Sequence, residues 1–483
     1  MTAATGLAAW AWSGVRDMAE TAAGTLDATL NEHRIRLAVT GLSRSGKTVF
    51  ITSLIQNLLA LGHGRDTLPL VSARLAQAGH TRLRSVRLVP TGVETLPHFD
   101  FRGHFAALAA QQPAWPRRTQ NLAQISLVIE ADHASGLRQR LGRRRVRLDI
   151  LDYPGEWLLD LPLLDRSFAD WSRETLAALA VPPRQRHAAA FLDFLRAIAP
   201  GDRQDDGLAR RGHDLYRRSL EACRDEAGLH YLQPGRFLCP GPQGEAPFLW
   251  FFPLPGVPET PAAGSLGALL RDRFETYKRQ IRADFFDTHF RAFDRQVVLV
   301  DVLGALHAGQ AAFEDTARAI LDLAQALRDG WGFWSRRRWL GLVRPIEHVA
   351  FVATKADHVP ALNRTNLRNL LEALAQPAAR SWETVRAPVS YHAAAAIRST
   401  EDGSAVLGGR TVEVVKGVVL GEDRVRPFYV GQVPSAVPPA SFWTGQYFAM
   451  PVFRPPLIDA SGTAGIRHLG LDEVLDAVIG DLL

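Results

Sequence analysis

The stretch Gly41-Leu42-Ser43-Arg44-Ser45-Gly46-Lys47-Thr48 decides the expected fold of this 483-residue chain. It follows the GxxxxGK[ST] pattern of a phosphate-binding loop, in which glycines permit positive φ and backbone N–H groups surround phosphate oxygens. A β-rich apolar run (residues 35–40) precedes the loop, and an apolar helical run (residues 48–61) follows it. Strand, loop and helix in this order are the context that phosphate binding at a helix N-terminus requires.

Each residue type in the loop has an expected role. The Lys47 ammonium reaches the β- and γ-phosphates of a nucleotide and is therefore also a candidate catalytic group, and the Thr48 hydroxyl binds Mg²⁺. The other expected nucleotide contacts in this stretch are Gly41, Ser43, Arg44, Ser45, Gly46 and Val49. The alternative is a glycine-rich turn that binds no ligand.

A second motif ends an apolar strand, in Leu148-Asp149-Ile150-Leu151-Asp152-Tyr153-Pro154-Gly155-Glu156. Asp152 stands where a strand-terminal carboxylate binds Mg²⁺, and Asp152-x-x-Gly155 matches the DxxG switch, whose glycine N–H contacts a γ-phosphate. This string resembles the translation-factor-like class of P-loop GTPases, which place Gln after the glycine to orient water. Here Glu156 stands instead. Its carboxylate could orient or deprotonate water, but its charge opposes phosphate, so hydrolysis stays open at this point.

Thr354-Lys355-Ala356-Asp357 follows a third apolar run and looks like the [NT]KxD motif of GTPases. Asp357 would accept hydrogen bonds from guanine N1–H and its amine, a donor pair that adenine lacks, while the Lys355 stem covers the base. The alternative is a strand-end turn with a capping aspartate. The fifth guanine-binding element is expected within residues 393–396, and we assign Ala395, whose N–H would meet guanine O6.

The first switch requires a threonine before the strand that pairs with the Asp152 strand. Thr119 is our choice, both as a Mg²⁺ ligand and as a candidate catalytic residue. Arg117 and Arg118 beside it, or Arg44 in the phosphate loop, could serve as an internal arginine finger. Exposed loop charge is the alternative for each of them.

Alternating strands and helices predict an α/β fold, with a mostly parallel sheet flanked by helices, a large mainly helical insertion and a small C-terminal α+β extension. We expect an N-terminal helix (1–31), a discontinuous G domain (32–156 and 295–400), the insertion (157–294) and the extension (401–483). Strands are expected at 85–89, 125–130, 146–151, 296–303, 348–354, 387–392, 411–420 and 446–453, with helices at 312–328, 361–376 and 471–483. The pair 125–130 and 146–151 should form a hairpin. Tyr277 and Lys278, on a helical stretch, are expected on the solvated surface.

Composition narrows the class of protein. Apolar residues make up 47%, charged residues 22%, and the net charge of +6 is not gathered into long stripes, so nucleic-acid binding is not expected. Two cysteines, no secretory leader and no long apolar run indicate a cytoplasmic protein without a transmembrane helix. Only four of the 56 basic residues are lysine, and two of these are Lys47 and Lys355, where a compact ammonium is useful.

Taken together, GLSRSGKT, WPxRT, LDILDYPGEW, ATKADHV and the closing FRPP…LGLDEVLDAVIGDLL resemble the YcjX family of bacterial stress-associated P-loop proteins. The resemblance implies GTP and GDP binding with Mg²⁺, a slow GTPase switch, and a link to phage-shock (envelope-stress) genes with a membrane-protein partner. The resemblance also implies a cytoplasmic protein, and peripheral association with the inner membrane is left open. A nucleotide-dependent scaffold with little hydrolysis and an ATP-driven enzyme are the alternatives.

One further segment bears on a partner. Residues 331–340 combine three tryptophans with three consecutive arginines. Such a mixture suits a membrane interface or a protein partner. Aromatic packing in the interior, ahead of the strand at 348, is the other interpretation.

Overall fold

The computed structural model describes residues 32–77, 80–90, 96–116, 121–133, 144–241, 244, 246–283, 293–338, 346–379, 388–445 and 448–482. The expected N-terminal helix and Thr119, with Arg117 and Arg118, lie outside these residues, as do the side chains of the aromatic and basic segment 331–340. Within the described part, no helix is both long enough and apolar enough to cross a membrane.

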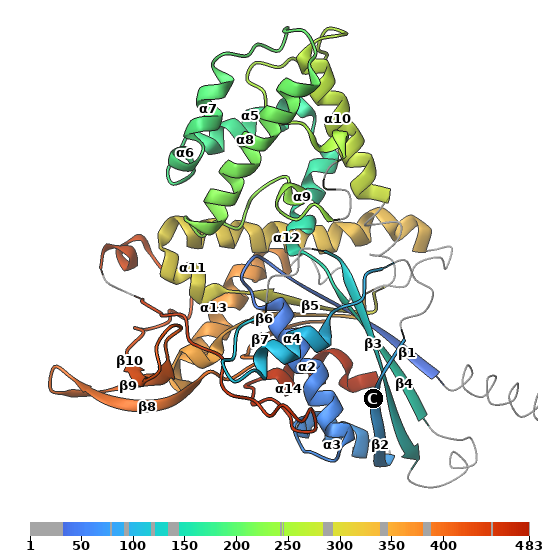
Figure 1. Cartoon of the computed structure of the whole chain (residues 1–483), viewed down its shortest axis with the longest axis vertical. Helices are drawn as coiled ribbons and strands as arrows, with labels where there is room; N and C mark the ends of the chain where they lie inside the picture. The colour runs from blue at the N-terminus through green and yellow to red at the C-terminus, as the bar shows by residue number, and fades with distance from the viewer. Residues whose placement is uncertain are drawn as a thin grey trace, which may run out of the picture.

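A seven-stranded sheet in the order β2-β3-β4-β1-β5-β6-β7 forms the centre of the molecule (Figure 1). Its strands are β1 (Glu32–Gly41), β2 (His80–Val89), β3 (Ala123–His133), β4 (Arg144–Asp152), β5 (Arg295–Val300), β6 (His348–Ala353) and β7 (Val389–Ala393). The pairs from β4 through β7 are parallel, whereas β2, β3 and β4 are antiparallel neighbours. The predicted α/β class and the predicted hairpin are therefore confirmed.

The central strands are buried on both faces, and this is why they read as continuous apolar runs. All six residues of β5 are buried. Val297 and Leu299 belong to one apolar core, and Val298 and Val300 belong to the other, as the two-residue period of a strand requires. The first core includes residues of α2 (Lys47–Gly62), α3 (Pro69–Gln77) and α14 (Leu471–Ile479); the second includes residues of α11 (Val302–Ala308), α12 (Gln310–Arg338) and α13 (Ala361–Ala379).

Two expected strands differ from the structure. The strand expected at 296–303 ends at Val300, because the Asp301 side chain accepts a hydrogen bond from the Gly304 N–H (2.9 Å) and starts α11. The strand expected at 446–453 is absent from the described residues of that segment. Only isolated bridges form there, between Val419 and Phe453 and between Gly431 and Phe448.

Figure 1 shows that the helices of residues 168–281, between β4 and β5, lie beyond α12, on the side away from the sheet. The described helices between β4 and β5 are 3 to 20 residues long. They are η2 (Gly155–Asp165), α5 (Phe168–Leu179), α6 (Arg184–His187), α7 (Ala189–Leu195), α8 (Asp206–Asp225), α9 (Gly235–Leu238), η4 (Pro247–Leu249) and α10 (Leu266–Ile281). Trp171 is fully buried among them and stacks on Phe274 at a centroid distance of 5.1 Å. The aromatic side chains of this segment thus belong to the same apolar core as Val298 and Val300.

Tyr277 and Lys278 are not solvated, so that expectation is wrong. Tyr277 is 0% exposed, because it continues the buried face formed by Leu270, Phe274 and Ile281 at helical spacing. The Lys278 ammonium donates to the Arg166 carbonyl at 2.9 Å. The Tyr277 hydroxyl donates to the buried carboxylate of Asp160 at 2.6 Å.

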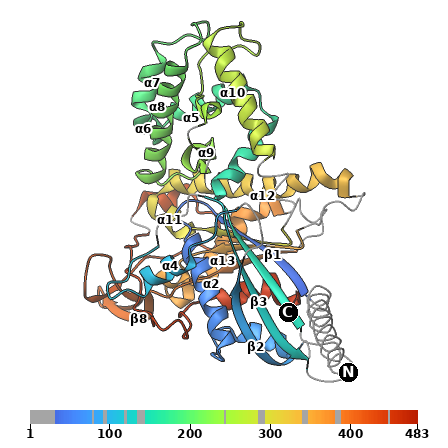
Figure 2. The same cartoon turned by 45° about the vertical axis from the view of Figure 1, so that its right-hand side comes forward.

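After β7 the chain forms a separate antiparallel sheet, β10-β9-β8, from β8 (Thr400–Leu407), β9 (Arg410–Val418) and β10 (Val425–Phe428). The short helices α4 (Phe101–Leu108), η7 (Ala356–His358), η8 (Ala440–Thr444) and η9 (Gly480–Leu482) complete the described elements. The closing helix α14 does not pack with this small sheet. It returns to the central sheet and contacts β5, β6, β7 and α3. Figure 2 shows from a second side that β8 of the small sheet and strands β2 and β3 of the central sheet lie on opposite sides of α2. The four-part division drawn from the sequence remains a proposal.

Candidate functional site

The loop between β1 and α2 has the backbone conformation of a phosphate cradle. Arg44 and Gly46 adopt left-handed conformations, with φ of 64° and 80°. Successive N–H groups around such positions form an anion-binding concavity. Gly41 is required for a different reason, because a Cβ there would lie 2.6 Å from the Leu299 carbonyl oxygen.

A cavity of about 410 Å³ opens beside this loop and is large enough for a nucleotide-sized ligand. It brings together most of the residues predicted from the separate motifs. Its lining consists of residues 42–50, Trp115, Pro116, Glu156, Val352, Thr354, Lys355, Asp357, His358, residues 394–397, Ser399 and residues 450–453. Motifs more than 300 residues apart in the chain therefore form the wall of one cavity.

The phosphate end of the cavity carries polar groups suited to a charged ligand. The Lys47 ammonium lies 3.8 Å from a carboxylate oxygen of Asp152, which is 1% exposed. The hydroxyls of Ser43 and Ser45 are buried and have no hydrogen-bond partner within the described chain. Buried hydroxyls are costly unless a partner satisfies them, so these residues fit a bound phosphate group. The Thr48 hydroxyl and the Asp152 carboxylate are oxygen donors of the kind that Mg²⁺ prefers beside phosphates.

Gly155 and Glu156 connect this end of the cavity to the helices between β4 and β5. A Cβ on Gly155 would lie 2.5 Å from the Gly41 carbonyl oxygen, so the switch motif touches the phosphate loop directly. Glu156 is 5% exposed and lines the cavity. On its far side, a Cβ on Gly235 of α9 would lie 2.0 Å from the Glu156 carbonyl oxygen. Three backbone segments thus meet with no side chain between them.

Asp160, four residues beyond Glu156, fixes the same junction. Its carboxylate accepts hydrogen bonds from the Gly235 N–H at 2.7 Å and from the Tyr277 hydroxyl. Burial raises the pKa of Asp160 to about 6, although these hydrogen bonds and Arg236 favour its charged form. The segment that follows the DxxG motif is therefore anchored to both α9 and α10.

Arg44, a candidate arginine finger, is directed toward the insertion in this structure. Its guanidinium donates to the Asp225 carbonyl at the end of α8 (2.9 Å) and lies 3.6 Å from the Asp225 carboxylate. His230 is buried nearby, and burial lowers its pKa while Asp301 and Asp315 oppose that shift. The end of α8 therefore contacts the phosphate loop through Arg44.

At the base end, Lys355 takes a left-handed conformation with φ of 61° and forms an ion pair with Asp301. Burial alone would raise the pKa of Asp301, but the Lys355 ammonium and the Gly304 N–H outweigh it and hold that pKa below its usual value. Asp301 comes from the end of β5, so the lysine is positioned by the neighbouring strand. Thr354 is buried and its N–H donates to the Val300 carbonyl at 3.0 Å.

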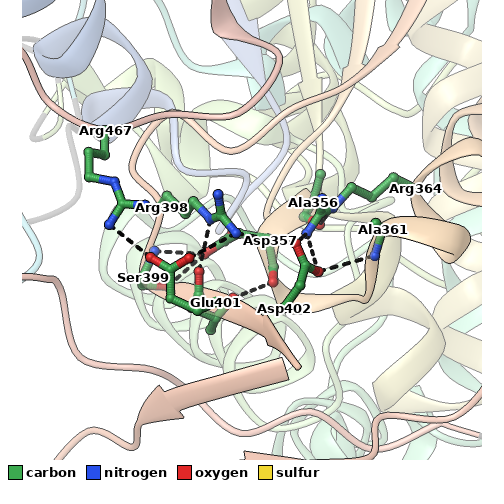
Figure 3. Close-up of polar contacts among 10 residues, drawn as sticks. Ala356, Asp357, Ala361, Arg364, Arg398, Ser399, Glu401, Asp402 and Arg467 are labelled. Carbon is green, nitrogen blue, oxygen red and sulfur yellow. Dashed lines mark hydrogen bonds and ion pairs between the residues drawn. The ribbon is translucent and has the colours of Figure 1, made fainter. Parts of the chain in front are cut away.

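The Asp357 carboxylate is held in place by Ser399, as Figure 3 shows. One of its oxygens accepts from both the N–H and the hydroxyl of Ser399, each at 2.8 Å, and Asp357 is 2% exposed. Beside it, the Arg364 guanidinium grips the Asp402 carboxylate with two hydrogen bonds, at 2.7 and 2.9 Å. The same guanidinium donates to the Ala356 carbonyl at 3.1 Å, so the start of β8 is tied to the loop of residues 354–357.

Sequence reasoning missed both Ser399 and Asp301. A serine shortly after the run of alanines at residues 393–396 was the available signal, but its distance from Asp357 is set by the fold. Ala395 does line the cavity, yet its N–H donates to the Leu469 carbonyl at 2.8 Å and would have to exchange partners to reach a base. Val49, also predicted, lines the cavity as well.

Comparison with known proteins agrees with this geometry. The chain is 34% identical over 461 residues to the Ras-like GTPase YcjX of Escherichia coli (strain K12), covering 94% of this chain and 96% of that protein. It is 33% identical over 477 residues to the Ras-like GTPase YcjX of Shewanella oneidensis, covering 95% and 96% respectively. The YcjX-like family, DUF463, matches residues 35–483, and the chain therefore belongs to this family.

Proposed function

We propose that this protein binds GTP and GDP in the described cavity and hydrolyses GTP slowly, with Mg²⁺, as a conformational switch. One observation carries the proposal: the phosphate loop with Lys47 and the loop with Asp357 line the same cavity. Similarity to two proteins named Ras-like GTPase supports the same assignment.

The roles of the phosphate-end residues follow from their positions. The loop N–H groups and Lys47 hold the β- and γ-phosphates, and Thr48 and Asp152 hold the metal ion, with Thr119 as the proposed third ligand. Bound Mg²⁺ would neutralise charge that develops on the phosphates. Gly155 offers its N–H to the γ-phosphate, so loss of that phosphate would release the segment that leads to Asp160.

At the other end, Asp357 would read the guanine edge, with Thr354, Lys355 and residues 394–396, including Ala395, around the base. The hydrogen bonds from Ser399 restrict the rotation of the Asp357 side chain, and a pre-oriented acceptor discriminates better between guanine and adenine. The Asp357 carboxylate disfavours an ATP-driven enzyme, because adenine lacks the pair of donors that it would accept from.

Glu156 raises a second candidate function, a nucleotide-dependent scaffold that hydrolyses little. Its carboxylate lines the phosphate end, where it would meet the γ-phosphate with like charge. Replacing Glu156 by Gln removes this charge and supplies an amide that can orient water. We expect Glu156→Gln to raise the single-turnover rate of GTP hydrolysis by about tenfold.

Phosphate release from GTP-loaded protein measures this effect. Glu226→Gln is the matched control, because the Glu226 side chain is 68% exposed. A rate that is indifferent to Glu156→Gln would remove Glu156 from the mechanism.

The function itself is tested by calorimetric titration with GTP, GDP and ATP, each with and without Mg²⁺, followed by a phosphate-release assay. We expect guanine nucleotides to bind far more tightly than ATP, and Mg²⁺ to strengthen GTP binding. Equal affinity for GTP and ATP would refute the assignment of Asp357.

The cellular role that we propose is a switch in the bacterial envelope-stress response, linked to phage shock. It rests on the family resemblance. We further propose a cytoplasmic protein with a membrane-protein or membrane-surface partner, peripheral at the inner membrane, and no nucleic-acid partner.

A further inference from the structure

The C-terminal segment Met450–Phe453 lines the nucleotide cavity, although no sequence motif points to it. Nearly 100 residues separate it from Asp357 along the chain. It lies beside the base end, because the His358 ring nitrogen Nδ1 is 3.1 Å from the Met450 sulfur, and the His358 ring meets the Phe453 ring edge-on at 4.9 Å.

Backbone pairing with the small sheet fixes this segment. The Leu420 N–H donates to the Val452 carbonyl and the Arg454 N–H donates to the Val418 carbonyl, both at 2.8 Å. The Phe453 ring is fully buried, and a Cβ on Gly417 would come within 2.6 Å of it. These contacts attach the segment to the small sheet, although it is not itself a strand.

Trp115, which precedes this segment by more than 300 residues in the chain, contacts it directly. Its indole N–H donates to the Phe453 carbonyl at 2.8 Å. Trp115 and Val49, the residue after Thr48, pack against the same small apolar cluster of Leu108, Ile397 and Ile466. Trp115 thus connects the first turn of α2 with the C-terminal segment, and it lines the cavity itself.

The chemistry of these groups fits the flat faces of a purine ring. Asp357 and Ser399 supply polar contacts for a ring edge, whereas Trp115 and Met450 supply aromatic and thioether surface. A thioether is polarisable and packs well on aromatic rings. Met450 is the only methionine after Met18.

We infer that Trp115 and the segment Met450–Phe453 form a second wall of the base site, which covers a purine ring and slows its release. This inference rests on the proposed function, since it assigns the residues that contact the base of the same nucleotide. The C-terminal part of the chain would then be a component of the nucleotide site.

The experiment measures the dissociation rate of GDP carrying a fluorescent group on its ribose, using the full chain. We expect Trp115→Ala to release GDP about tenfold faster, since one base–aromatic contact contributes on that scale. Met450→Ala, which removes a thioether, should release GDP about fivefold faster. Trp115→Phe, which keeps a ring but loses the bond to the Phe453 carbonyl, should have a smaller effect. Calorimetric binding of tripolyphosphate, which has no base, should be unchanged in all three.

Leu457→Ala is the control, because Leu457 belongs to the same C-terminal stretch, is 74% exposed and does not line the cavity. Thermal melting without nucleotide shows whether each variant folds. If Trp115→Ala does not fold, the GDP release rate of Met450→Ala tests the inference. Unchanged GDP release from a folded Met450→Ala variant would overturn this inference and leave the proposed function intact. Absence of GDP binding by the unmodified chain would overturn the proposed function and, with it, the inference.

Discussion

The two ends of the nucleotide cavity are built in different ways. The phosphate end comes mostly from one continuous stretch, in which Arg44 and Gly46 take left-handed conformations and place successive N–H groups around a common point. The base end is assembled from distant parts of the chain: Lys355 is paired with Asp301, Asp357 is held by Ser399, and Met450–Phe453 closes the side. The phosphate end therefore depends on local backbone geometry, and the base end depends on tertiary structure.

This difference predicts different responses to mutation. A change in the phosphate loop removes contacts with every nucleotide, whereas a change at the base end alters the choice among nucleotides.

The largest effect is expected for Lys47→Ala. Loss of the ammonium that we propose to contact the phosphates should weaken GTP and GDP binding by about 100-fold or more, because hydrogen bonds between charged groups are the strong ones. Calorimetry measures the affinities. Lys416→Ala, which removes an exposed lysine of β9, should leave them unchanged. Unaltered GTP affinity in Lys47→Ala would contradict the assignment of the phosphate loop.

Asp357→Asn should act on selectivity rather than on phosphate binding. The amide replaces one acceptor by a donor, so the preference for GTP over ATP should fall by about 100-fold. Competition between GTP and ATP for a fluorescent nucleotide gives this ratio. Asp402→Asn is the matched control, since Asp402 lies in the same polar cluster (Figure 3) but does not line the cavity. A preserved ratio would show that Asp357 does not read the base.

A smaller effect is expected for Ser399→Ala, which removes one of the two hydrogen bonds to Asp357. GTP affinity should fall by about fivefold, the scale of one hydrogen bond, while tripolyphosphate binding stays the same. Ser399→Thr retains the hydroxyl and should restore most of the affinity. Equal losses for GTP and tripolyphosphate would indicate a general change of structure instead.

The smallest effect concerns stability and tests the junction beyond the phosphate end. Asp160 has a pKa of about 6 in the fold and an ordinary value of 3.8 when unfolded. Between these values the folded state keeps a proton that the unfolded state has lost, so this contribution to stability is complete below pH 4 and falls as the pH rises to about 6. Asp160→Asn should remove that part of the slope.

Melting temperatures between about pH 4.5 and about pH 7 measure the slope. The control is Asp193→Asn, whose side chain is 65% exposed and whose loss should leave the slope intact. The same slope in both variants would show that Asp160 does not carry the proton.

The features that could be predicted from the sequence are those that depend on local structure, as at the phosphate end. The strand, loop and helix around Lys47, and the acidic strand that ends at Asp152, are local patterns, and their positions were predicted to within a few residues. The long buried strands were predicted for the same reason, since apolar runs of six residues leave few alternatives.

What could not be predicted depends on contacts between distant segments. Nothing in the residues near Ser399 indicates that its hydroxyl reaches Asp357, 42 positions earlier. The segment that ends at Phe453 has the apolar composition of a strand, but its described residues pair only through isolated bridges. Pro451 lies between those bridges and has no N–H to donate to a strand ladder. The prediction for Tyr277 was wrong because tyrosine occurs both on surfaces and in cores. Its burial follows from its position on the face of α10 that packs inward.

The contacts made by Gly41, Gly155, Glu156 and Gly235 have a mechanical consequence. At each of these junctions backbone packs on backbone, so no flexible side chain is available to absorb a displacement. Closely packed atoms transmit strain because they have little free volume in which to yield. If a bound phosphate displaced the loop that contains Gly41, these contacts would carry the displacement through Gly155 and Glu156 to Gly235 of α9, because no side chain lies between them.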